Sequence, residues 1–245
     1  MSAERYRERI YRHYVAAHAG GALVVDAASL APRRAYLQRL VAAHFPPDRD
    51  AAVIDLGCGH GTLLQQAARA GYRNLSGVDA SPQQVAMAAS LGIPGVRQGD
   101  LGAALAALPD GSQAAVVSFD VIEHFTKDET VDFVDQVRRV LQPGGRWIIH
   151  VPNGESPFGG RSRYGDFTHE QAFTRGSLTQ LLLASGFSSV ACVEDAPVGH
   201  GAKSRLRALL WRLVRLGLRF LLAVETGDTG RDAIFSQNLL CVAVK

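Results

Sequence analysis

Three glycines stand at alternate positions, Gly57, Gly59 and Gly61, in the stretch VIDLGCGHGTLL. Glycine allows a sharp turn and lets a ligand approach the backbone closely, so a glycine turn between a strand and a helix is typical of a nucleotide-binding crevice. Two cofactor classes compete for this turn. A dinucleotide normally requires G-x-G-x-x-G and a helix that faces its pyrophosphate. The GCGHG spacing, with Asp55 in the preceding apolar run, better suits a cationic, amino-acid-like ligand.

Carboxylates recur at the ends of the next predicted strands, at Asp79, Asp100 and Asp120. The carboxyl ends of neighbouring parallel strands meet at one edge of a sheet, so we expect these side chains to face a single crevice. At such an edge Asp79 can accept hydrogen bonds from the hydroxyls of a ribose. The acidic residues therefore predict one nucleotide-type site.

Two histidines are candidates for a general base, which helps a hydroxyl acceptor to lose its proton. His124 follows a predicted strand directly, and His169 lies in the long segment 152–174. His124 could instead bond to the backbone at the start of a helix. Asp166 and Glu170 are the alternative bases in the same segment.

The segment 152–174 is predicted to be a long irregular loop at the active edge of the sheet, and such loops are often functional. We expect it to bind substrate, with Arg161 and Arg163 meeting an anionic group and Tyr164 beside them. The aromatic residues expected to anchor the loop are Phe158 and Phe167. A solvated surface loop without a ligand is the alternative.

Residues of metal-binding type also occur near these candidates, namely Glu123, His124, His150 and His169. Their spacing along the chain matches no metal-binding motif. The sequence therefore predicts no metal site.

Strands alternate with helices along the chain, which predicts a parallel, doubly wound α/β sheet. Short apolar runs predict strands at 53–56, 74–79, 96–100, 114–120, 146–151, 188–194 and 238–244. Helical patterns and capping residues predict helices at 62–70, from Ser81 to near Gly92, from Thr126 to a break at the PGG of 143–145, and at 174–185. The third of these helices is expected to pack on the core through an apolar stripe formed by Val131, Val134, Val137 and Leu141.

Composition is that of an ordinary globular protein. Lys and Arg number 26 against 23 Asp and Glu in 245 residues, an excess too small to indicate a nucleic-acid partner. The three cysteines have no paired spacing, which fits a reducing cytoplasm. The N-terminus is too charged for a signal peptide, and no apolar stretch of about 20 residues predicts a spanning helix.

The stretch 203–225 is predicted to be a helix with arginines in one narrow stripe and leucine, tryptophan and phenylalanine over most of the remainder. A basic stripe beside a broad apolar face is typical of an interfacial membrane helix, here one that would lie on the inner face of the membrane. Packing on the protein's own core, or on a second subunit in a homodimer, is the alternative.

Several motifs together resemble class I S-adenosylmethionine-dependent methyltransferases. They are VIDLGCGHGTLL, GVDASPQQV, QGDL, FDVIEHF and VRRVLQPGGRWIIHVPN, in the order and spacing of that family over roughly 51–153. The resemblance implies a Rossmann-like, seven-stranded sheet with an antiparallel last strand. The sequence also predicts four parts of the chain: a helical cap at 1–50, a cofactor-binding core at 51–195, a helical insertion at 196–233 and the last strand at 234–245. In the cap, Tyr14 could touch the ligand, or it could belong to a plain packing stripe.

The resemblance also assigns cofactor contacts. The methionine part of S-adenosylmethionine would be lined by Asp55, Gly57, Cys58 and Gly59. The ribose hydroxyls would bond to Asp79, with Ala80 beside the adenine. The edge and face of the adenine would meet Asp100 and Leu101. The sulfonium would lie beside Phe119, Asp120 and Val121.

The whole chain is similar to methyltransferases of bacterial surface-polysaccharide or lipopolysaccharide synthesis, through PNGESPFGG, YGDFTHEQAFT and TGDTGRDAIFSQN. This similarity implies O-methylation of a sugar hydroxyl of a cell-surface glycan or of its lipid- or nucleotide-linked precursor. The main alternative is a small-molecule O-methyltransferase of the quinone or phenol type. A nicotinamide-dependent oxidoreductase is disfavoured by the glycine spacing.

Overall fold

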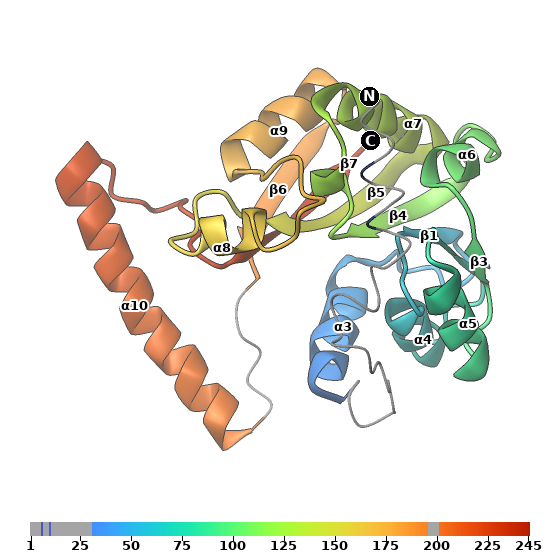
Figure 1. The fold of residues 1–245 in the computed structure, drawn as a ribbon, viewed down its shortest axis with the longest axis horizontal. Helices are drawn as coiled ribbons and strands as arrows, with labels where there is room; N and C mark the ends of the chain where they lie inside the picture. Colours follow the sequence, from blue (N-terminus) through green and yellow to red (C-terminus); the bar gives the residue numbers. More distant parts are fainter. Residues whose placement is uncertain (1–5, 7–9, 11–30, 196–200) are drawn as a thin grey trace.

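The computed structural model describes Tyr6, Ile10, residues 31–195 and residues 201–245. A seven-stranded sheet in the order β3-β2-β1-β4-β5-β7-β6 forms its centre (Figure 1). The strands are β1 (Val53–Leu56), β2 (Leu75–Asp79), β3 (Val96–Gln98), β4 (Gln113–Phe119), β5 (Leu141–Pro152), β6 (Ser189–Glu194) and β7 (Asn238–Val244). The pairs from β3 to β5 are parallel, and β7 runs antiparallel to both of its neighbours. The predicted fold class and the antiparallel last strand are therefore confirmed.

Helices cover both faces of the sheet (Figure 1). One face carries α3 (Ala31–His44), α4 (Thr62–Arg69) and α5 (Pro82–Ser90). The other carries α6 (Leu101–Ala106), α7 (Lys127–Val140) and α9 (Arg175–Ala184). Strands covered on both faces read as continuous apolar runs, and β4 is accordingly buried from Gln113 to Ser118. The core holds the carboxyl ends of the parallel strands in fixed positions, where the candidate site lies.

Two predicted details of α7 and β5 were wrong. The PGG sequence does not separate the two elements, because β5 begins at Leu141, which pairs with Gln113 ahead of a register shift. Val131 does not belong to the buried stripe, since 43% of it is exposed, and Leu141 lies in the strand. The helix buries Phe133 and Val140 in addition to the predicted valines.

The predicted helix starts are mostly confirmed. Thr126 begins α7 with a complete capping box. Ser81 accepts a hydrogen bond from the Gln84 N–H at the start of α5, but the Gln84 side chain does not return the bond. Its Oε1 lies 3.1 Å from His60 Nδ1 instead. His60 therefore links the glycine turn to the start of α5.

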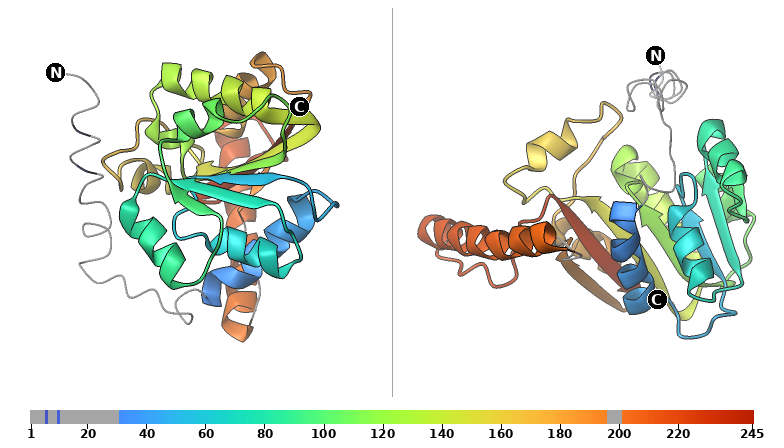
Figure 2. Two further views of the ribbon diagram at one scale, coloured as in Figure 1. Left: turned by 90° about the vertical axis from the view of Figure 1, so that its right-hand side faces the viewer. Right: turned by 90° about the horizontal axis from the view of Figure 1, so that it is seen from below.

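The helix α10 (Ala202–Thr226) projects to one side of the body (Figures 1 and 2). Part of its basic stripe meets the protein, since Arg215 Nε lies 3.1 Å from Glu194 Oε1 and Arg219 donates to the Arg231 carbonyl at 2.8 Å. Arg205 and Arg212 of the same stripe are exposed. Large apolar side chains point to solvent, with Leu213 59% and Phe220 67% exposed. Packing of this apolar face on the protein's own core, one of the predicted alternatives, is therefore wrong. Among the described residues no helix is long and apolar enough to cross a membrane.

The predicted N-terminal cap falls largely outside the described residues, and so does Tyr14. Within 1–50, α3 buries Leu37, Leu40 and Val41 against the sheet. The boundaries of the four predicted parts of the chain stay predictions.

Candidate functional site

The turn between β1 and α4 requires glycine for two reasons. Gly57, Gly59 and Gly61 all have positive φ, at 76°, 55° and 78°, a conformation that other residues rarely adopt. A Cβ atom at Gly57 would also lie 2.5 Å from Val121 Cγ2, too close for real contact. The Gly57 and Cys58 N–H groups both donate to the Val78 carbonyl, at 2.8 and 3.1 Å. The turn is therefore fixed against β2 with no side chain between it and Val121.

Asp79 stands where β2 ends and is held in place by backbone donors. Its Oδ2 accepts from the Gly59 N–H at 2.7 Å, and its Oδ1 accepts from the Ser81 N–H at 2.8 Å. Each carboxylate oxygen has two lone pairs, so each retains one acceptor site. Asp79 can thus receive two hydroxyl donors without moving.

Asp55 is a buried carboxylate that lacks a partner. It is 2% exposed, and its Oδ1 has no hydrogen-bond partner among the described residues. Burial, and then the charge of Asp79, raises the pKa of Asp55 to about 7. A cationic group beside Asp55 would stabilise the charged form of this buried carboxylate. The α-amino group of S-adenosylmethionine has that charge, so the turn fits this cofactor.

A cavity of about 490 Å³ adjoins the ends of β2 and β3. Its walls include Ala80, Asp100 and Leu101, the predicted adenine contacts, together with His124 and Phe125. Asp100 Oδ1 caps α6 by accepting from the Ala103 N–H at 2.8 Å. The predicted adenine residues and one predicted base therefore line the same space.

The residues predicted beside the sulfonium lie at the end of β4. Asp120 has φ +54°, an uncommon conformation for a non-glycine residue that often marks a functional position. Its Oδ1 lies 2.7 Å from His150 Nδ1, and His150 Nε2 lies 3.2 Å from Asp195 Oδ2. Phe119 stacks on the His150 ring with centroids 4.8 Å apart. Burial would lower the pKa of His150, but the two carboxylates outweigh it and raise that pKa to about 9.

His124 belongs to a short chain of hydrogen bonds that ends at a carboxylate. The Thr168 hydroxyl donates to Asp166 Oδ1 at 2.7 Å and therefore accepts from His124 Nδ1, 2.8 Å away. This assigns the proton of the neutral ring to Nδ1 and leaves Nε2 as the basic nitrogen. Burial, and then the neighbouring His169, lowers the pKa of His124 to about 4. Sequence reasoning missed Thr168, whose role depends on a contact far along the chain.

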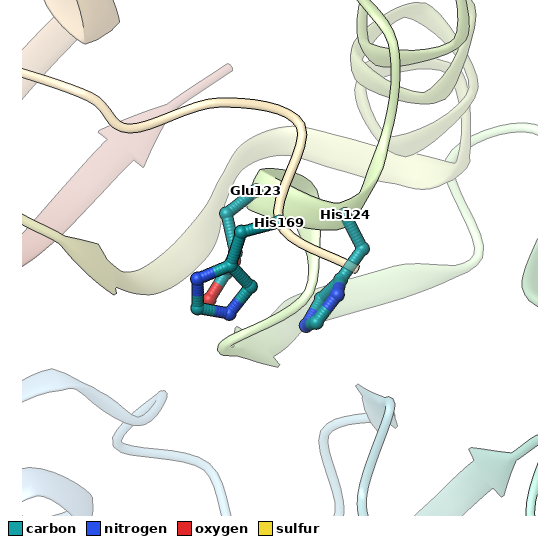
Figure 3. Close-up of side chains that lie close together, drawn as sticks. All are labelled: Glu123, His124 and His169. Carbon is teal, nitrogen blue, oxygen red and sulfur yellow. The ribbon is translucent and has the colours of Figure 1, made fainter. Parts of the chain in front are cut away.

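His169 lies beside His124, with ring centroids 4.7 Å apart (Figure 3). Its Nδ1 lies 3.0 Å from the Ser162 carbonyl. Arg163 donates to the carbonyls of His169 and Glu170, so this guanidinium holds the loop that carries His169. The structure thus brings together the predicted bases His124, His169 and Asp166, and it gives Arg163 a structural contact that the sequence did not suggest.

The segment 152–174 is not irregular throughout as predicted, because it contains the short helix α8 (Gly159–Arg163). It presents aromatic groups to solvent. Phe158 and Phe167 are 55% and 79% exposed, so the prediction that they anchor the loop was wrong. Tyr164 is 80% exposed, and Arg161 is also exposed. Their contacts with substrate stay predictions.

Tyr6 reaches this loop from the N-terminal part of the chain. Tyr6 donates its hydroxyl to Glu170, and its ring meets the Phe167 ring edge-on with centroids 6.1 Å apart. Tyr6 therefore lies beside the loop that carries His169.

Comparison with known proteins agrees with this geometry. Residues 53–145 match the family described as "Methyltransferase domain". A probable S-adenosylmethionine-dependent methyltransferase of Mycolicibacterium smegmatis is 36% identical over 170 residues, which cover 67% of this chain and 60% of that protein. A ubiquinone biosynthesis O-methyltransferase of Chelativorans sp. is 30% identical over 131 residues, which cover 49% of this chain and 51% of that protein. The chain thus spans between half and two thirds of the length of these relatives.

A solved structure shares the fold. The S-adenosylmethionine-dependent methyltransferase from Archaeoglobus fulgidus has a TM-score of 0.63 at 18% identity, covering 90% of this chain and all of that one. The family match disfavours the nicotinamide-dependent alternative. On the motifs, the sheet order and these matches, the chain contains a class I S-adenosylmethionine-dependent methyltransferase domain, the cofactor of which is S-adenosylmethionine.

Proposed function

We propose that the protein transfers a methyl group to a hydroxyl oxygen of its acceptor. The observation that carries this proposal is the hydrogen-bonded chain His124–Thr168–Asp166, whose histidine lines the cavity beside Ala80 and Leu101. An amine acceptor needs no such group once it is neutral, whereas a hydroxyl acceptor gains from a base that takes its proton.

The residues of the glycine turn would bind and orient the cofactor. S-adenosylmethionine supplies a methyl group that is already activated on a sulfonium. Asp55 would pair with the α-amino group, and Asp79 would accept from the ribose hydroxyls while it holds Gly59. Ala80, Asp100 and Leu101 would surround the adenine. The sulfonium would lie against Phe119, Asp120 and Val121.

His124 would take the proton of the acceptor at Nε2. The Thr168 hydroxyl accepts the bond from Nδ1–H, and Asp166 holds the hydroxyl, so the ring keeps the tautomer and orientation that a base requires. Holding the acceptor oxygen in line with the methyl group supplies much of the remaining acceleration, because proximity replaces a bimolecular encounter. His169 is the alternative base.

The proposed acceptor is a sugar hydroxyl of a cell-surface glycan or of its lipid- or nucleotide-linked precursor. Support comes from the loop motifs and from the exposed Arg161, which can meet a phosphate. The exposed apolar side of α10 supports an acceptor at a membrane surface, and we place the protein in the cytoplasm at the inner face. A phenol or quinone-type acceptor is the second candidate, favoured by the relative named for ubiquinone biosynthesis.

Substitution of the base tests the proposal. His124→Asn should lower turnover by about a hundredfold while the affinity for S-adenosylhomocysteine stays unchanged. Thr168→Val should give a smaller loss, and His44→Gln, on α3, serves as the matched control. Unchanged turnover in both His124→Asn and His169→Asn would exclude a histidine base.

A further inference from the structure

Three side chains of metal-binding type converge from two segments that lie far apart in the sequence. Glu123 and His124 belong to the short helix η1 (Ile122–His124), and His169 belongs to the loop that precedes α9. One ligand atom from each residue lies within 4.8 Å of the other two (Figure 3). His150, which the sequence grouped with them, binds Asp120 and Asp195 instead. Spacing along the chain could not reveal this cluster.

Glu123 provides a second, independent observation. It is 0% exposed, and neither of its carboxylate oxygens has a hydrogen-bond partner among the described residues. A buried carboxylate without a partner is strongly unfavourable, and native proteins pair such groups with cations or metals. In Figure 3 the carboxylate lies next to the two imidazole rings.

Both histidines have the outer contacts that metal-binding histidines usually have. His124 Nδ1 lies 2.8 Å from the Thr168 hydroxyl, and His169 Nδ1 lies 3.0 Å from the Ser162 carbonyl. Such acceptors fix the tautomer of a metal-bound histidine and raise its basicity as a ligand. The contacts assign Nε2 of each ring as the ligand atom.

The backbone joins the two elements that supply the ligands. The carbonyl of Glu123 accepts from the N–H groups of Glu170 and Gln171, at 2.8 and 3.0 Å. Gln171 Nε2 also donates to the Phe125 carbonyl at 2.8 Å. Ligand atoms around a tetrahedral zinc ion lie about 3.3 Å apart, so a contraction of at most about 1.5 Å from the observed separations within 4.8 Å would close the site.

We propose that Glu123, His124 and His169 bind one divalent transition-metal ion, through a carboxylate oxygen and two imidazole Nε2 atoms. Two imidazoles with one carboxylate favour zinc, iron, manganese or cobalt over magnesium, which prefers oxygen ligands. Three protein ligands leave at least one coordination position open, as in catalytic metal sites.

During methyl transfer, the metal ion would activate the acceptor hydroxyl in place of the histidine base. This catalytic role rests on the proposed transfer to oxygen. His124 lines the cavity that also holds the predicted adenine contacts, so an acceptor hydroxyl in that cavity can reach the open position. A metal-bound hydroxyl loses its proton more readily, here to a water molecule. The oxygen then forms the new O–CH₃ bond as the S–CH₃ bond breaks, and the sulfur keeps the electron pair.

Metal binding can be measured without any acceptor. The full chain is treated with a chelator, dialysed and titrated with zinc chloride by calorimetry, and in parallel with cobalt chloride by visible absorption. We expect one zinc ion per chain and a cobalt spectrum of low-symmetry coordination. Glu123→Gln and His169→Asn should each weaken zinc binding by at least tenfold, and Thr168→Val by about tenfold to a hundredfold. The control His44→Gln should bind zinc like the wild type.

The outcomes separate the inference from the proposed function. Absence of one-to-one zinc binding, or equal binding by wild type, Glu123→Gln and His169→Asn, would overturn the metal site. His169→Asn changes a half-buried loop residue, so it provides the answer if the buried Glu123→Gln does not fold. Zinc binding without methyl transfer to any hydroxyl would leave the metal site standing and refute the proposed function. Full methyl transfer by metal-free protein would refute the catalytic role of the metal and leave His124 as the base.

Discussion

Replacing Asp55 by asparagine is expected to stabilise the free protein and to weaken its binding of the cofactor. The carboxylate is buried and its Oδ1 has no hydrogen-bond partner in the part of the chain that the structure describes, so the folded state without ligand holds an unfavourable charge. The same charge would be neutralised by the amino group of S-adenosylmethionine. Stability and binding should therefore change in opposite directions.

The size of the effect follows from the raised pKa of Asp55, which shifts from 3.8 to about 7. One pKa unit corresponds to about 1.4 kcal/mol, so the shift corresponds to at most about 4 kcal/mol of destabilisation above neutral pH. Because the pKa of this acid is raised in the folded state, the destabilisation is absent below its unfolded pKa and grows until pH exceeds the folded pKa. The buried amide of the new asparagine would also be left without a hydrogen-bond partner, and this cost offsets part of the gain. We therefore expect Asp55→Asn to raise the free energy of unfolding by about 1–2 kcal/mol near pH 8.

Denaturant unfolding of the free protein and calorimetric titration with S-adenosylhomocysteine measure the two effects. Loss of a charged hydrogen bond of about 1.5–3 kcal/mol should weaken binding about tenfold to a hundredfold. The affinity of the wild type should also fall as pH drops from about 8 to about 6, since Asp55 then binds a proton that the ligand must displace. Asp55→Asn should lack this pH dependence.

The control is Asp135→Asn, which removes an exposed carboxylate of α7. It should leave stability and binding unchanged. A less stable Asp55→Asn protein, or one that binds S-adenosylhomocysteine as tightly as the wild type at every pH, would refute the assignment of Asp55 to the amino group.

Three further predictions concern the site and α10. Asp79→Ala should weaken S-adenosylhomocysteine binding at least tenfold in a folded protein, and unchanged affinity in calorimetry would remove Asp79 from the site. The pKa of His150 is raised to about 9, so its protonated ring should stabilise the fold by about 3 kcal/mol below pH 6.5, and this contribution should be lost as pH rises through 9. The free energy of unfolding of His150→Gln, measured by denaturation, should therefore depend less on pH than that of the wild type. The protein should sediment with anionic but not neutral vesicles, with less binding at high salt. The apolar side of α10 and its basic residues Lys203, Arg205, Arg207 and Arg212 are exposed and suit an anionic lipid surface. The double variant Leu209→Ser with Leu213→Ser should no longer sediment with vesicles, and its melting temperature should be unchanged because both side chains are more than half exposed. Failure of the wild type to bind anionic vesicles at low salt would contradict membrane contact.

Local patterns predicted the sheet because each strand carries its own signal. The β-branched run 53–56 matches β1 residue for residue, and the Thr126 capping box marks the start of α7. The PGG of 143–145 was misread because it lies between two pairings with β4, of Leu141 with Gln113 and of Arg146 with Ala115, and strand pairing is a long-range property. When its neighbouring strand is unknown, a glycine-rich stretch is interpreted as a loop between two elements.

The site was predictable only in part, for a related reason. Asp55 and Asp79 could be placed because they lie at or next to the carboxyl ends of strands whose order follows from the fold. Thr168 and the meeting of Glu123 with His169 depend on how the loop 152–174 folds back on η1, which no local pattern encodes. The helix α10 was ambiguous because an amphipathic pattern does not say whether its apolar side meets protein or remains exposed.

Transfer of an isotopically labelled methyl group tests the central claim most directly. The purified protein is incubated with labelled S-adenosylmethionine and separate pools of nucleotide sugars, lipid-linked sugars and phenols, and the labelled product is located by mass spectrometry and NMR. We predict label on an oxygen of the product and loss of this transfer in His124→Asn. Label on nitrogen or carbon, or no labelled product from any pool, would contradict the account.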